Sequence, residues 1–259
     1  MSGLLTSPAT TELHPAFMMM HGSEPGVKDG FGQQILAHYM IGQGIALLTY
    51  DKRGVGDSGG TYHEYPDESN VNLIASDAVA GINYLATRPE INSAKLGLIG
   101  GSQAGWVIPV AVNESDKVNF FVILSGPVLS LAQDNKYSAV TNDGESVTTY
   151  DAEQLNQTLR EMKSSGVDPI PVLAELTQTG LWLWGSMDKS VPVIVSAENL
   201  QVLIESGKQN FSYFILANGD HNLNESMHGY FAEIPYAPRV LYFSELTKWL
   251  EENNIIPKE

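Results

Sequence analysis

The feature that most constrains the fold is the segment at residues 96–109, which reads LGLIGGSQAGWVIP. Its first four residues form an apolar run typical of a buried parallel strand, and apolar residues recur at helical spacing after Ser102. A strand that turns directly into a helix at a serine needs small flanking residues, because the strand end and the helix start approach closely. Gly100 and Ala104 meet this requirement, although Ala104 followed by Gly105 replaces the last glycine of the usual G-x-S-x-G pattern. The segment predicts that Ser102 lies on a tight strand-to-helix turn.

Composition limits the partners of the chain. The 259 residues carry 30 acidic and 14 basic side chains, which gives a formal net charge of −16. This charge repels nucleic-acid phosphates and anionic membrane surfaces, so we expect neither as a partner. The absence of cysteine excludes disulfides, thiol catalysis and cysteine-ligated zinc. Because no two of the six histidines have the spacing of a metal site, we expect no metal and no cofactor.

The sequence shows no pattern typical of a signal peptide or a membrane-spanning segment. The first residues, MSGLLTSPATTELHP, contain no basic segment followed by an apolar run, and no segment approaches the ~18 apolar residues that cross a bilayer. We therefore expect a cytoplasmic protein, with a leader-processed form left open. The length suits a single α/β unit with an insertion, and a homodimer stays open.

Short apolar runs alternate with amphipathic segments along most of the chain. The expected strands are residues 3–7, 16–20, 45–50, 96–99, 120–124, 181–184 and 211–216. The expected helices are residues 31–40, 71–87, the segment after Ser102, 193–205 and 238–252. This alternation predicts a mostly parallel sheet covered by helices on both faces, with functional loops at the carboxyl ends of the strands.

The alternation stops between residues 128 and 180, where we find no strand pattern and two helical segments at 152–164 and 170–176. We therefore predict a catalytic core formed by residues 1–127 and 177–259. Residues 128–176 are predicted to form a small helical cap inserted into that core.

Two later residues could complete a site around Ser102. A serine hydroxyl is a weak nucleophile at neutral pH and needs a histidine base that a carboxylate orients. Asp188 follows the strand at 181–184, and His221 follows the strand at 211–216. The order Ser, Asp, His at successive strand ends is that of one class of α/β enzyme. Asp220 is an alternative acid, but it is adjacent to His221 in sequence and its side chain is expected to point elsewhere. His228 is an alternative base, but it lies beyond the loop at the end of the strand.

Five segments together resemble the α/β-hydrolase superfamily, in particular its esterase and serine-aminopeptidase-like branch, which is similar to dienelactone hydrolases. They are HGS at 21–23, YDKRGVGDSGG at 50–60, GGSQAGW at 100–106, GSMDKSVP at 185–192 and GDHNL at 219–223. The resemblance implies the α/β-hydrolase fold, with Ser102 as nucleophile, His221 as general base and Asp188 as the acid that orients it. It also implies an oxyanion hole formed by the backbone N–H groups of Gln103 and Ser23.

The resemblance has further implications for the loops. Gly22, His21 and Trp106 are expected to bind substrate, with His21 shaping the oxyanion loop rather than carrying a proton. Because only about fifteen residues precede the strand that ends at Met20, we expect the N-terminal edge strands to be reduced.

The GDSGG sequence at 56–60 also occurs around the nucleophile of trypsin-like proteases. That fold is all-β and rich in disulfides, whereas this chain alternates strands with helices and has no cysteine. The segment also lacks the lysine-serine ending of a phosphate-binding loop. We instead expect Asp51 and Arg53 to form an ion pair that fixes this loop.

The resemblance and the site residues together predict a carboxylesterase that cleaves small to medium esters through an acyl-enzyme on Ser102. Apolar residues of the cap are expected to line its pocket: Val128, Leu129, Leu131, Tyr137, Ile170, Val172 and Leu173. A thioesterase and a non-catalytic ligand-binding protein of the same fold remain alternatives. An aminopeptidase-like serine peptidase is another, and it would need an acidic anchor for the substrate amine in the cap. The candidates are Asp134, Asp143, Glu145, Asp151, Glu153, Glu161, Asp168 and Glu175.

Overall fold

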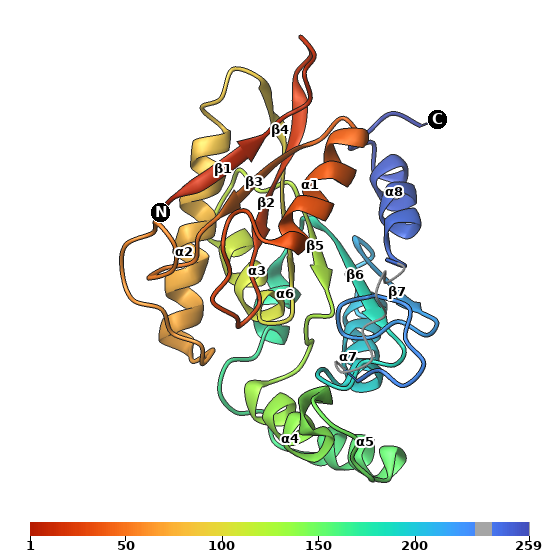
Figure 1. The fold of residues 1–259 in the computed structure, drawn as a ribbon. Coiled ribbons are helices and arrows are strands. Elements are labelled where there is room, and N and C mark those ends of the chain that lie inside the picture. Colours follow the sequence, from red (N-terminus) through yellow and green to blue (C-terminus); the bar gives the residue numbers. More distant parts are fainter. Residues whose placement is uncertain (231–239, 259) are drawn as a thin grey trace.

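A seven-stranded sheet forms the centre of the computed structural model, which describes residues 1–230 and 240–258 (Figure 1). The strands are β1 (Gly3–Thr6), β2 (His14–Met20), β3 (Ala46–Tyr50), β4 (Ile91–Gly101), β5 (Phe120–Leu124), β6 (Thr179–Gly185) and β7 (Phe211–Leu216). Their spatial order is β1-β3-β2-β4-β5-β6-β7. Only β1 runs antiparallel to its neighbour, β3, and all other pairs are parallel. The carboxyl ends of β2 to β7 therefore meet at one edge of the sheet.

Helices cover both faces of the sheet, which explains why the central strands are apolar throughout. One face is covered by α1 (Phe31–Gly42) and α8 (Phe243–Glu252), whose apolar side chains share a core with Phe17 and Leu47. The other face carries α2 (Glu68–Leu85), α3 (Ala104–Asn113) and α7 (Val193–Glu205) in a larger core. The predicted α/β-hydrolase architecture is confirmed, and β1 is the single antiparallel strand at its N-terminal edge.

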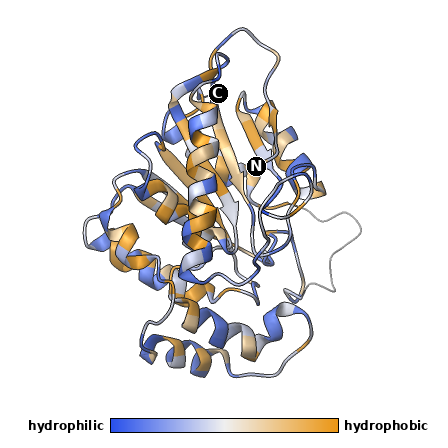
Figure 2. Cartoon of the chain, turned by 90° about the vertical axis from the view of Figure 1, so that its left-hand side faces the viewer, coloured by the Kyte–Doolittle hydropathy of each residue, from blue (hydrophilic) through white to orange (hydrophobic). Residues whose placement is uncertain are grey.

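The insertion between β5 and β6 holds α4 (Leu131–Thr141), the 3₁₀ helix η1 (Asn142–Gly144), α5 (Ala152–Glu161) and α6 (Ile170–Glu175). Figures 1 and 2 show α4 and α5 at one end of the molecule, beyond the sheet, with hydrophobic and hydrophilic residues alternating along them. In contrast, α6 packs into the main core through Leu173, followed there by Leu176. Apart from Leu131, which packs into the main core, the α4–α5 pair forms a separate small cluster with Tyr137, Leu155 and Leu159.

The sequence did not predict α4, because its sequence LAQDNKYSAVT has no broad apolar stripe. A capping box starts the helix: Gln133 Oε1 accepts hydrogen bonds from the Ser130 N–H at 3.0 Å and from the Ser130 hydroxyl at 2.6 Å. By contrast, the helix predicted at 152–164 is present as α5, which ends three residues earlier at Glu161 and buries Leu155 and Leu159.

Several expectations about the pocket and the helix bounds need correction. Most of the apolar residues assigned to the substrate pocket pack into the main core instead, among them Val128, Leu131 and Leu173. The last helix begins at Phe243 rather than at residue 238, because Val240 pairs with Asn224 in an isolated bridge; residues 238 and 239 lie outside the described residues. The helix predicted at 71–87 starts three residues earlier, after an N-cap at Asp67. No helix in the described residues is long and apolar enough to span a membrane.

Candidate active site

Ser102 lies on the turn between β4 and α3 with a φ of 53°. This left-handed region is uncommon for residues other than glycine, and such strain clusters at functional sites. The Ser102 N–H donates to the carbonyl of Leu124, at the end of β5, at 2.9 Å. The neighbouring strand therefore holds the turn in place.

The clearances around this turn explain why Ala104 is accepted there. A Cβ added to Gly100 would lie 2.6 Å from the carbonyl oxygen of Met20 and 2.8 Å from the Cβ of Ala104. A Cβ on Gly105 would lie 2.7 Å from Cδ of Pro127. The close approach that requires glycine therefore falls at Gly105, and Gly100 leaves room for the methyl group of Ala104.

The structure brings Asp188 and His221 together at the carboxyl ends of β6 and β7. Nδ1 of His221 lies 2.9 Å from Oδ2 of Asp188, whose side chain is completely buried. The other carboxylate oxygen accepts the N–H groups of Ser190 at 2.8 Å and Val191 at 2.9 Å. Because the carboxylate is fixed in this way, it can hold the imidazole with Nδ1 as the donor and Nε2 directed elsewhere.

The charges around His221 favour its protonated form. Burial by itself would lower the pKa of His221, but the carboxylate of Asp188 outweighs it, with further contributions from Asp143 and Asp134. The net effect is a raised pKa. The rival acid, Asp220, is used differently, since its Oδ1 accepts the N–H groups of Asn222 and Asn224 at 2.9 Å.

Two backbone amides border Ser102. A Cβ on Gly22 would lie 3.4 Å from Cβ of Ser102, so the peptide that joins Gly22 to Ser23 is next to the serine. In the part of the chain that the structure describes, neither the Ser23 N–H nor the Gln103 N–H donates a hydrogen bond to another protein group. Both donors are available to a ligand, as an oxyanion hole requires.

His21 and Trp106 both contact the protein's own backbone. His21 is buried and its Nε2 lies 2.6 Å from the carbonyl oxygen of Tyr50. The buried indole of Trp106 donates to the carbonyl of Leu129 at 3.0 Å, which ties α3 to the start of the insertion. These contacts let His21 shape the loop after β2, and the substrate-binding role predicted for both residues stays a prediction.

The ion pair predicted between Asp51 and Arg53 is wrong. Asp51 is buried beneath its loop, where Oδ2 lies 2.7 Å from Nζ of Lys28 and the N–H groups of Lys28 and Asp57 also donate to it. Arg53 reaches α2 instead, and its Nε lies 2.6 Å from Oδ2 of Asp77. Burial alone would raise the pKa of Asp51, but the donors from Lys28 and Asp57 lower it to about 2.

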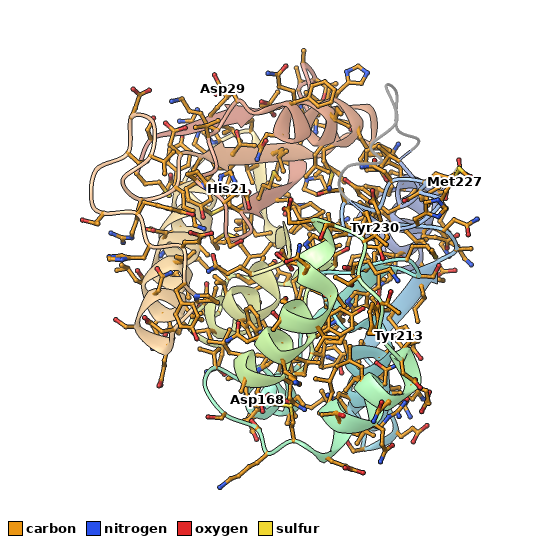
Figure 3. The ribbon with its side chains drawn as sticks, turned by 60° about the horizontal axis from the view of Figure 1, so that its bottom comes forward. His21, Asp29, Asp168, Tyr213, Met227 and Tyr230 are labelled. Carbon is orange, nitrogen blue, oxygen red and sulfur yellow. The ribbon has the colours of Figure 1, made fainter. Side chains whose placement is uncertain are left out.

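Helix α4 lies over this edge of the sheet. On one side Asn135 Nδ2 contacts the hydroxyl of Tyr65 at 3.3 Å, and on the other the Tyr137 hydroxyl donates to the carbonyl of Asp188 at 3.1 Å. The Ser138 hydroxyl adds a bond of 3.3 Å to the carbonyl of Ser190. Figure 3 brings this end of the molecule forward and shows α4 in front of the sheet, with Asp168 marking the loop that leads to α6.

Asp134 lies one turn before Tyr137 and Ser138, on the face of α4 that meets the Asp188 loop. Its Oδ1 is shielded from solvent and has no hydrogen-bond partner among residues 1–230 and 240–258. Burial above all raises the pKa of Asp134 to about 8, the carboxylates of Asp143 and Asp188 add to this, and His221 opposes it. The sequence placed Asp134 only among eight candidate anchors. The orphaned oxygen and the nearby imidazole now distinguish it.

Lys52 is a buried, positively charged residue beside the site. The sequence did not predict a role for it. Its position two residues after an apolar strand was the available signal, since such positions lie at the carboxyl edge of the sheet. Among the described residues, no group of three or more histidine, aspartate or glutamate side chains could hold a metal ion.

Comparison with known proteins identifies the family. Residues 33–241 match the prolyl oligopeptidase family. The chain belongs to this family. Rat inactive dipeptidyl peptidase 10 (Rattus norvegicus) is 21% identical over 257 residues, a match that covers 94% of this chain and 29% of that protein. The chain thus spans less than a third of the length of this relative.

Solved structures share the fold of this chain. Est1E from Butyrivibrio proteoclasticus, determined with ferulic acid bound, has a TM-score of 0.61 and 16% identity, and the match covers 98% of this chain and 94% of that one. A puromycin-hydrolyzing peptidase of Mycobacterium tuberculosis has a TM-score of 0.61 and 18% identity, over 85% of this chain and 34% of that one. At these identities the likeness shows the fold, and the predicted α/β-hydrolase superfamily is confirmed.

Proposed function

We propose that the chain hydrolyses carboxylic esters through an acyl-enzyme on Ser102. The observation that carries the proposal is the buried Asp188–His221 pair, at the same sheet edge as a strained serine with two unbonded amides beside it. Fixing Nδ1 of His221 against Asp188 leaves Nε2 as the base for the serine hydroxyl.

In the proposed reaction, Oγ of Ser102 attacks the ester carbonyl carbon while Nε2 of His221 takes the hydroxyl proton. The carbonyl oxygen becomes an oxyanion that accepts hydrogen bonds from the N–H groups of Ser23 and Gln103. The bond from carbon to the alcohol oxygen then breaks, and His221 returns the proton to the leaving alcohol. Water, deprotonated by His221, attacks the acyl-enzyme and releases the acid with Ser102 restored.

The test combines turnover with covalent labelling. Propionyl 4-nitrophenyl ester should be hydrolysed by the wild type and not by Ser102→Ala, and a fluorophosphonate probe should attach to Ser102. Ser125 offers a matched control, because it also directly follows a parallel strand and has a positive φ, of 47°. We expect Ser125→Ala to retain labelling. Equal hydrolysis by the wild type and Ser102→Ala would refute the proposal.

A second candidate is the hydrolysis of aminoacyl compounds, and Asp134 is the observation that favours it. A buried carboxylate oxygen without a partner, near His221, could accept hydrogen bonds from a substrate ammonium group. The carboxyl would then lose its proton when the cation binds. Such a site would make the chain a peptidase of small amine-bearing substrates rather than a general esterase.

Two matched substrates separate the candidates, since alanyl and propionyl 4-nitroanilide differ only in the amino group. If Asp134 binds the ammonium group, Asp134→Asn should raise KM for the alanyl compound and leave the propionyl compound unchanged. An equal effect on both substrates would remove this role from Asp134, and the ester proposal would stand.

A further inference from the structure

We propose that Lys52 is a positioning residue that holds both donors of the oxyanion hole in place, an inference that rests on the proposed function of Ser102. Lys52 is the second residue after β3, which ends at Tyr50, and it is 2% exposed. Its side chain runs beneath the loop after β2 and ends beside the start of α3. It therefore touches both segments that supply the amides next to Ser102.

The first contact is with the loop after β2. Nζ of Lys52 donates to the carbonyl oxygens of Gly22 at 2.5 Å, Ser23 at 3.2 Å and Glu24 at 3.4 Å. The carbonyl of Gly22 and the N–H of Ser23 belong to one trans peptide unit, in which the two groups point in opposite directions. By holding the carbonyl oxygen, Lys52 fixes the direction of the Ser23 N–H.

The second contact is with the residue after the serine. Nζ of Lys52 lies 3.0 Å from Oε1 of Gln103, and Nε2 of Gln103 donates to the carbonyl of Glu64 at 3.1 Å. Both polar atoms of the buried Gln103 amide group are thereby hydrogen-bonded. Because its backbone N–H is the other proposed donor, one ammonium group links the two halves of the oxyanion hole.

Packing does not explain a lysine at this position. The oxygens that accept its hydrogen bonds are all uncharged, and burial of an ammonium group costs free energy. Burial lowers the pKa of Lys52 to about 8, although the carboxylates of Glu24 and Glu64 oppose this. A methionine would fill a similar length without that cost, so the gain lies in the hydrogen bonds that the ammonium group makes.

Tyr62 strengthens the same arrangement. Its hydroxyl donates to the carbonyl of Ser23, and its ring lies 5.4 Å from Nζ of Lys52, within range of a cation–π interaction. The loop that contains Tyr62 also supplies the carbonyl of Glu64. The lysine therefore joins three segments that are distant in sequence.

The experiment compares Lys52→Met with Lys52→Arg and with a control, Lys28→Met, which removes the other lysine of this region. For propionyl 4-nitrophenyl ester we expect Lys52→Met to lower kcat about 10²–10³-fold, as loss of one oxyanion donor does, with KM little changed. Lys52→Arg, which keeps the charge and several donors, should recover part of the loss. A trifluoromethyl ketone, which forms an oxyanion on Ser102, should bind Lys52→Met more weakly by a similar factor.

Gln103→Met is the second variant, in case Lys52→Met unfolds. It should lower kcat, and in the double variant the two losses should fail to multiply, because both act through one link. A folded Lys52→Met, or in its place a folded Gln103→Met, with kcat within twofold of the wild type would overturn the inference while labelling of Ser102 upholds the proposed function. If the wild type and Ser102→Ala hydrolyse the ester equally, both proposals fall.

Discussion

Nδ1 of His221 lies 2.9 Å from one oxygen of Asp188, and two backbone N–H groups occupy the other oxygen. The carboxylate therefore has a single orientation, with one oxygen for the protein's backbone and one for the imidazole. Because a carboxylate only accepts hydrogen bonds, the neutral imidazole of His221 carries its proton on Nδ1. Substitutions that change the donor pattern without changing the shape can test it.

Asp188→Asn should lower kcat by about 10⁴-fold, the size of loss seen when the orienting carboxylate of a triad becomes an amide. The asparagine oxygen can still accept from Ser190 and Val191, so its NH₂ group faces Nδ1 of His221 and selects the wrong tautomer. Ester turnover and circular dichroism measure this. Asp220→Asn is the matched control, and a comparable loss there would move the orienting role to Asp220.

Asp143→Asn should shift the acid limb of the pH profile to lower pH. His221 acts as a base only when neutral, so activity falls as the pH drops through its raised pKa. Asp143 is one of the carboxylates that raise the pKa of His221, and removal of its charge therefore lowers that pKa. The profile of kcat/KM measures the shift. Asp168→Asn, in the same insertion, should leave the limb in place, and an unshifted limb in Asp143→Asn would contradict the expectation.

Asp134→Asn should stabilise the fold more at high pH than at low pH. Because its folded pKa of about 8 exceeds its ordinary value of 3.8, the unfolded chain releases this proton first, and the stability of the wild type falls as pH rises between these values. Thermal unfolding at about pH 5 and pH 9 measures the difference in Tm. Asp116→Asn, at an exposed position, serves as control; a gain independent of pH would argue against the buried acid.

Gly105→Ala should destabilise the protein by about 1–3 kcal/mol, the usual cost of overpacking. The new Cβ would lie 2.7 Å from Pro127, and the backbone there cannot move without displacing the turn at Ser102. Gly32→Ala is the control, because its added Cβ meets no described atom within 4 Å other than those of the adjoining helix backbone, and alanine is favoured in a helix by about 0.5–1 kcal/mol. Urea denaturation measures the free energy of unfolding, which should fall in Gly105→Ala and rise in Gly32→Ala.

The sequence predicted the elements that obey a simple apolar period. The bounds of β5, β7 and α7 agree with the expected ranges, because short apolar runs and a helix with one apolar face leave a clear pattern, even though β7 is a half-buried edge strand. Helix α4 left none, since it is held by a polar cap and by hydrogen bonds to distant loops. Its position depends on contacts that no local window contains.

Among the charged residues, too, some contacts were predicted from the sequence and others depend on three-dimensional packing. Asp188 and His221 were predicted to act together, from their positions at the ends of two strands that the fold brings side by side. Asp51 and Arg53 are close in the chain, and that closeness led to the wrong pair, because the direction of each side chain depends on the packed loop. Lys52 was overlooked because lysine is normally a surface residue, and only its three-dimensional surroundings identify it.

The clearance at Gly105 has a consequence for how relatives of this chain are recognised. A search pattern that demands glycine two residues after the serine passes over a chain with Ala104 at that point. What the turn requires in this chain is an empty volume where the helix start meets the Gly126–Pro127 peptide, and Gly105 supplies that volume. A criterion based on the space available at the strand-to-helix turn, rather than on a fixed glycine position, would include this chain.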